Sequence, residues 1–285
     1  MTEFVQTALL GIVAVGVLWL AYVKKFFQWN PNRPWDSKVF LAYVLIAFAL
    51  YFGISTILVT GYLVLLKKYF PDLPQIAYAV WLNFLNSGSI LIALAILWKT
   101  LPPFTRHGII HCESVPLNLA NDFKMGLYAW LISCPLVLFL TTFLEWLVLT
   151  LFNATFIPDQ LAVYFVKMTF SDPFYFAITI ITIVIITPLV EETLFRGFLQ
   201  SFIRRHIGSK QAILVTSTCF ALFHYSPEQG LGNIPIVGTL FVLALFLGYL
   251  YEKQGSLFAS ISLHALFNGI SILNLYFLGR IPCFF

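Results

Sequence analysis

Long apolar runs restrict the fold of this chain more than any other feature of its sequence. They lie at residues 4–23, 39–66, 76–98, 125–152, 173–202, 211–224, 235–251 and 258–278. Most of them approach or exceed the roughly 20 residues that an α-helix needs to cross the hydrocarbon core of a bilayer, although 211–224 is short. Unpaired backbone N–H and C=O groups are costly in lipid, so each run is expected to form a helix. The sequence therefore predicts an all-α, polytopic transmembrane helix bundle of about eight spans.

The composition leaves too little polar surface for a soluble protein. Of the 285 residues, 60% are hydrophobic and 10% are charged, and the mean hydropathy is +0.90. Soluble domains carry about 25% charged residues. The net charge of +4 indicates no binding of nucleic acid, because the Lys and Arg residues flank the apolar runs. We expect a multi-pass integral protein of the bacterial inner (cytoplasmic) membrane, surrounded by the lipid bilayer.

A linker at residues 153–172 offers the single domain boundary that the sequence suggests. Residues 1–170 are predicted to form an N-terminal transmembrane extension of about four helices plus the linker. Residues 171–285 are predicted to form the functional core.

Two carboxylates and a guanidinium stand at the end of the fifth apolar run, where ionisable groups are expensive. Glu192 and Arg196 have the i, i+4 spacing and the acid-first order that favour an ion pair on one helix face. Glu191 is rotated by about 100° and has no such partner. Pro188, just before it, is expected to kink the helix and to free backbone carbonyls nearby. Taken alone, the segment is equally compatible with an ion pair at a helix end beside a solvated Glu191.

Two histidines in later apolar runs favour a functional interpretation of Glu191. His224 follows Phe220 by four residues, and Asn268 follows His264 by four, so each pair shares one helix face. A turn at Gly208, close to midway between Glu191 and His224, would place both at similar depth in antiparallel helices. A lone histidine in an apolar helix usually satisfies a hydrogen bond, but two of them with an unpaired glutamate indicate a shared site.

The chemistry of these side chains is that of a hydrolytic centre. Imidazole nitrogen and carboxylate oxygen are ligands of catalytic zinc, which lowers the pKa of a bound water to near neutral. A nearby carboxylate can act as the general base. An amide such as Asn268 can orient a ligand or donate a hydrogen bond to an oxyanion.

Three segments resemble the motifs of the CPBP family of intramembrane proteases, which includes CAAX prenyl proteases and bacteriocin-processing proteins and was formerly called Abi. The motifs of that family are EExxxR, FxxxH and HxxxN, in this order. The matching segments are Glu-Glu-Thr-Leu-Phe-Arg-Gly at 191–197, Phe-Ala-Leu-Phe-His at 220–224 and His-Ala-Leu-Phe-Asn at 264–268. The resemblance covers about residues 171–285.

The resemblance implies an intramembrane endopeptidase, a hydrolase of membrane-bound peptide or protein substrates. It implies that Glu191 and His224 activate a water, while His264 and Asn268 complete the site by binding metal or stabilising the oxyanion. The expected catalytic set is Glu191, His224, Asn268, Glu192 and Arg196, the last two in a supporting role. The expected zinc ligands are Glu191, His224 and His264, with a metal-free, glutamate-dependent mechanism as the alternative.

Two other functions remain open at this stage. A transporter could use the buried Glu and His residues to relay protons, although transporters often contain internal repeats and none is visible here. A non-catalytic scaffold or regulator could share the same fold.

Overall fold

The computed structural model describes residues 2–32, 35, 38–157 and 160–279, and within these ranges the chain is helical and contains no β-strand. The predicted all-α class is therefore confirmed. The helices before the linker are α1 (Thr2–Val23), α2 (Leu41–Tyr69), α3 (Gln75–Thr100), α4 (Pro103–Ile110) and α5 (Leu119–Leu151). Those after it are α6 (Leu161–Thr169), α7 (Pro173–Ile180), α8 (Thr187–Glu192), α9 (Ser201–Ile207), α10 (Ser209–Phe223), α11 (Asn233–Gln254) and α12 (Leu257–Leu278).

Seven helical segments of the described chain are long and apolar enough to cross a membrane. The protein is thus an integral multi-pass membrane protein. One of these segments, Pro173–Ile207, runs continuously through α7, α8 and α9. The expected sixth span does form a helix, α10, but its 15 residues rise only about 22 Å, less than the ~30 Å hydrocarbon core. The prediction of about eight spans therefore exceeds by one the number of helices with spanning length.

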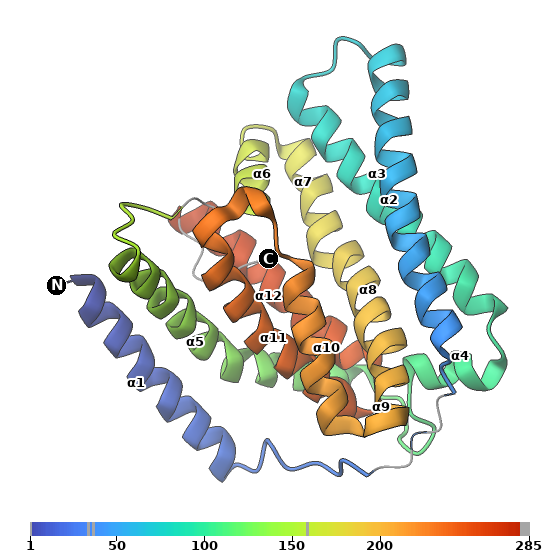
Figure 1. Ribbon diagram of the computed structural model, residues 1–285, viewed down its shortest axis with the longest axis vertical. Coiled ribbons are helices and arrows are strands. Elements are labelled where there is room, and N and C mark those ends of the chain that lie inside the picture. Colours follow the sequence, from blue (N-terminus) through green and yellow to red (C-terminus); the bar gives the residue numbers. More distant parts are fainter. Residues whose placement is uncertain (1, 33–34, 36–37, 158–159, 280–285) are drawn as a thin grey trace.

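The helices pack around the Pro173–Ile207 segment and α10–α12 (Figure 1). On one side α5 lies against both α11 and α12, and α1 covers α5. The approach of α5 to α12 depends on Gly126, because a Cβ atom there would lie 2.8 Å from the Cβ of Ser262 and 3.1 Å from the backbone nitrogen of Leu263. This close packing fixes the backbone just before His264.

On the other side, α2 and α3 form a hairpin beside the Pro173–Ile207 segment (Figure 1). Aromatic rings join the hairpin to the rest of the bundle. The ring centroids of Phe48 and Phe195 are 5.5 Å apart, and those of Tyr51 and Phe223 are 5.2 Å apart. Because Phe195 and Phe223 flank the acidic motif and His224 in sequence, the hairpin covers the region that carries the predicted site.

Candidate active site

The helix that carries Glu191 is irregular on both sides of α8. The segments Ile181–Ile186 and Thr193–Gln200 are π-helical, and the N–H of Thr187 donates to the carbonyl of Thr182, five residues back. In that register the next bond would run from the N–H of residue 188 to the carbonyl of Ile183, but residue 188 is a proline and has no N–H. The side-chain amide of Asn268 takes its place, with Nδ2 donating to the carbonyl of Ile183 at 2.9 Å. The proline thus leaves a carbonyl next to the site for a side chain of α12 to bind, in agreement with the expectation from sequence.

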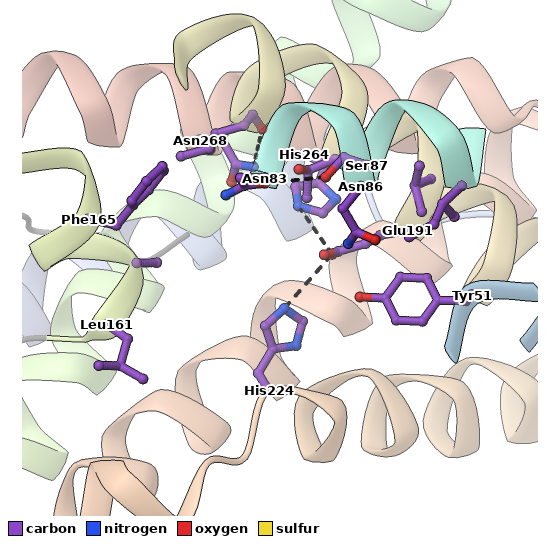
Figure 2. A pocket seen from close by; sticks show the side chains of 15 residues that line it. Tyr51, Asn83, Asn86, Ser87, Leu161, Phe165, Glu191, His224, His264 and Asn268 are labelled. Carbon is purple, nitrogen blue, oxygen red and sulfur yellow. Dashed lines mark hydrogen bonds and ion pairs between the residues drawn. The ribbon is translucent and has the colours of Figure 1, made fainter. Parts of the chain in front are cut away.

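Glu191, His224 and His264 meet in one place, as their positions in the sequence predicted (Figure 2). The chain reverses at Gly208, whose φ of 85° suits glycine, and α10 then runs back alongside the preceding helix. Glu191 Oε2 lies 3.8 Å from Nε2 of His224 and 3.9 Å from Nε2 of His264. Both distances are too long for direct hydrogen bonds.

The hydrogen bonds at Nδ1 of the two histidines determine which ring nitrogen of each faces Glu191. Nδ1 of His264 lies 2.8 Å from Glu192 Oε1, and Nδ1 of His224 lies 2.8 Å from the carbonyl oxygen of Phe220. A carboxylate and a carbonyl can only accept, so each Nδ1 carries the proton. In the neutral rings Nε2 is then unprotonated, and two imidazole lone pairs and one carboxylate oxygen face a common point. A cation between them would satisfy all three, and a water, which has two hydrogens, would satisfy two of them.

The donor types suit zinc, whereas their spacing is somewhat wide for it. Ligands about 2.1 Å from a tetrahedral zinc ion are separated by about 3.4 Å, a few tenths of an ångström less than the distances here. As the side chains stand, no group of three His, Cys, Asp or Glu residues within the described ranges could hold a metal ion. Glu191 Oε2 is nevertheless buried and has no hydrogen-bond partner in the described part of the protein. The arrangement accommodates a water directly, and a metal after a small contraction.

Glu192 and Arg196 form the predicted i, i+4 ion pair, and both side chains are 0% exposed. Arg196 Nη1 donates to Glu192 Oε1 at 2.8 Å, and Nη2 donates to the carbonyl of Ala244 in α11 at 3.2 Å. The guanidinium also lies over the ring of Phe220, 4.6 Å from its centroid. Since Glu192 Oε1 also accepts from His264, one carboxylate oxygen ties the arginine to the histidine. The sequence suggested the ion pair but not its contact with His264.

A pocket of about 430 Å³ opens at Glu191, His224, His264 and Asn268. Figure 2 shows that helices outside the motif segments supply much of its wall. The residues that the sequence reasoning missed are Tyr51 of α2, Asn83, Asn86 and Ser87 of α3, and Leu161, Ala162 and Phe165 of α6. One available signal was polar residues at i, i+3 and i+4 within the otherwise apolar run of α3.

Comparison with known proteins concerns the segment that carries Glu191, His224, His264 and Asn268. Residues 173–270 match the family model of Rce1-like type II CAAX prenyl endopeptidases. This segment of the chain is similar to the CPBP/CAAX protease family. The predicted resemblance is thus confirmed.

One curated relative extends the similarity beyond the segment matched by the family model. It is a protein of Lactococcus lactis subsp. cremoris described as a UPF0177 protein in the abiGi 5' region. The two are 26% identical over 242 residues, which cover 84% of this chain and 92% of the relative. No solved structure matches the chain.

Proposed function

We propose that this protein is an intramembrane endopeptidase, which hydrolyses a peptide bond of a membrane-associated substrate, prenylated or leader-type. The observation that carries the proposal is the convergence of Glu191 Oε2 with the Nε2 atoms of His224 and His264. A water held there could donate hydrogen bonds to Glu191 Oε2 and to one histidine Nε2 in the pocket. The bacterial source of the relative supports a place in the bacterial cytoplasmic membrane.

Glu191 serves as the general base in this proposal. Its Oε2 takes a proton from the water as the water oxygen attacks the carbonyl carbon of the scissile bond. When the C–N bond breaks, the same proton passes from Glu191 to the leaving amine nitrogen. Nε2 of one of the two histidines accepts the second hydrogen of the water, and Glu192 keeps Nδ1 of His264 protonated so that Nε2 of His264 faces the water.

Zinc remains a proposal that the donor set supports. Glu191, His224 and His264 would hold it, and the metal would lower the pKa of its bound water and polarise the scissile carbonyl. The replacement of both histidines by alanine is expected to lower the zinc content of the purified protein, measured by elemental analysis. Full proteolytic activity in excess 1,10-phenanthroline would contradict the zinc mechanism and leave Glu191 as a metal-free base.

The experiment that tests the proposed function is comparative mass spectrometry of peptide termini in membranes. Cells that express the wild type are compared with cells that express Glu191→Gln, which keeps the size of the side chain and removes the base. We expect products that are present with the wild type and fall at least 100-fold with Glu191→Gln. Glu228→Gln, an exposed acid four residues after His224, is the matched control and should retain the products. Undiminished processing by Glu191→Gln would refute the assignment of the base.

A further inference from the structure

Three polar side chains form a continuous strip on the wall of the pocket, outside the segment that matches the family model. They are Asn83, Asn86 and Ser87 of α3, which we call the α3 strip (Figure 2). Their i, i+3 and i+4 spacing places them on one face of the helix. Polar groups in the middle of a membrane span are expensive, so the strip calls for a physical explanation.

The bonds that the strip makes within the protein are weak. Ser87 Oγ donates to Asn83 Oδ1 at 3.3 Å, within the strip itself. Asn86 Nδ2 donates to Ser55 Oγ of α2 at 3.4 Å, near the upper limit for a hydrogen bond. Asn86 Oδ1 is buried and has no partner among the described residues. The protein therefore leaves part of the hydrogen-bonding capacity of the strip unused.

Attachment of α3 to α2 accounts for little of the strip, because the shorter bond between the two helices comes from a residue outside it. Ser89 Oγ and Tyr62 Oη of α2 are 3.0 Å apart, a good hydrogen-bond distance, and neither residue lines the pocket. Ser89 of α3 therefore joins α3 to α2 through a hydrogen bond with Tyr62. The α3 strip is turned toward the pocket instead.

The three atoms that face the proposed water supply no hydrogen-bond donor, although Tyr51 and Thr187, which carry hydroxyl groups, also line the pocket. Glu191 Oε2 and the two histidine Nε2 atoms can only accept hydrogen bonds in the neutral rings. Asn268 Nδ2 already uses a hydrogen on the carbonyl of Ile183. A peptide carbonyl beside the proposed water would need donors from elsewhere, and the amide groups of Asn83 and Asn86 are donors that line the same pocket.

We propose that Asn83 and Asn86 bind the main chain of an extended peptide substrate in the pocket that Glu191 also lines. The inference rests on the proposed function and adds the surface that holds the substrate. A peptide backbone offers N–H and C=O groups in alternation, and a carboxamide offers a donor and an acceptor of matching geometry. Contacts of this kind recognise the extended backbone of the substrate rather than its side chains.

The test measures binding separately from cleavage. The host is full-length Glu191→Gln in detergent micelles, and the probe is a fluorescein-labelled farnesylated CAAX peptide followed by fluorescence anisotropy. The comparison is between this host and the same host with Asn83→Leu and Asn86→Leu, changes that keep the number and branching of the side-chain heavy atoms. With two hydrogen bonds lost, we expect the Kd to rise by about tenfold or more. Ser89→Ala in the same host is the matched control and should leave the Kd unchanged.

A modified probe tests the same contacts without altering the protein. Replacement of a backbone amide of the peptide by an ester removes one N–H and weakens one carbonyl acceptor. The ester should bind the host more weakly than the amide peptide, and the double leucine variant should bind both equally.

The possible outcomes separate this inference from the proposed function. Equal binding by the host and the double leucine variant, or binding by neither, would overturn the role of the strip. Undiminished processing by Glu191→Gln would refute the base assigned in the proposed function, yet a lower affinity in the leucine variant would still support the strip.

Discussion

Glu192 is the residue on which the buried polar groups of the site depend most. Its Oε1 accepts from Arg196 Nη1 and from Nδ1 of His264, both at 2.8 Å. Loss of one partner of a buried ion pair leaves the other charge uncompensated, which typically costs about 3–5 kcal/mol. Glu192 therefore affects the stability of the bundle as well as the orientation of His264.

Glu192→Leu is accordingly expected to lower the free energy of unfolding by about 3–5 kcal/mol, measured by thermal or detergent-induced unfolding. The double variant Glu192→Leu/Arg196→Leu removes both charges and should regain most of that stability. Its proteolytic activity should stay low, because Nδ1 of His264 has lost its acceptor in both variants. Recovery of activity together with stability would contradict a positioning role for Glu192.

At the scale of single residues, the sequence identified the central side chains but not all of their partners. Glu191, His224 and His264 could be predicted because an ionisable group in an apolar run is rarely accidental. The contact of Glu192 with His264 could not, because Arg196 already appeared to satisfy that carboxylate. A carboxylate can accept several hydrogen bonds, and only the packing of α12 against α8 shows the second one.

At the scale of helices, the π-helical register around Pro188 links two segments of the site. The carbonyl of Ile183 would lose its side-chain donor if Asn268 were changed to alanine. An unsatisfied buried acceptor costs about 1–3 kcal/mol. A backbone N–H at position 188 could replace that donor, and only proline prevents it.

We therefore predict coupling between Pro188→Ala and Asn268→Ala. Asn268→Ala should destabilise the wild-type protein more than the Pro188→Ala protein, by about 1 kcal/mol in a double-mutant cycle of unfolding free energies. Pro235→Ala, at a buried proline near the start of α11, is the matched control and should combine additively with Asn268→Ala. If the effects of Pro188→Ala and Asn268→Ala were also additive, a backbone N–H at residue 188 would not replace the Asn268 amide as donor to the Ile183 carbonyl.

The helices themselves were predictable because hydropathy reports the length of an apolar run directly. The π-helical segments were not, since runs such as Ile181–Ile186 have the same composition as ordinary apolar helix. The short α10 shows the same limit, because its sequence is apolar while its 15 residues end at Phe223, before a full crossing. Hydropathy predicts where a helix lies in the chain and gives little information about its register.

At the scale of the whole molecule, the site is not confined to the segment that matches the family model. Tyr51 of α2, the α3 strip and Leu161 of α6 all line the pocket and precede residue 173. Gly126 of α5 sets the approach to α12 next to His264. The division into residues 1–170 and 171–285 stays a prediction about sequence organisation, while the pocket draws on both parts.

This shared pocket leads to a prediction about separated fragments. Residues 171–285 expressed alone should bind and cleave no peptide, because one wall of the pocket and the helix that supports α12 are missing. Co-expression with residues 1–170 should restore part of the activity, since transmembrane helices that insert separately can associate by packing. The measurement is cleavage of the membrane peptides that depend on Glu191, with a 1–170 fragment carrying Gly126→Leu as the control that should fail to restore it. Full activity of residues 171–285 alone would show that the first half of the chain contributes nothing to catalysis.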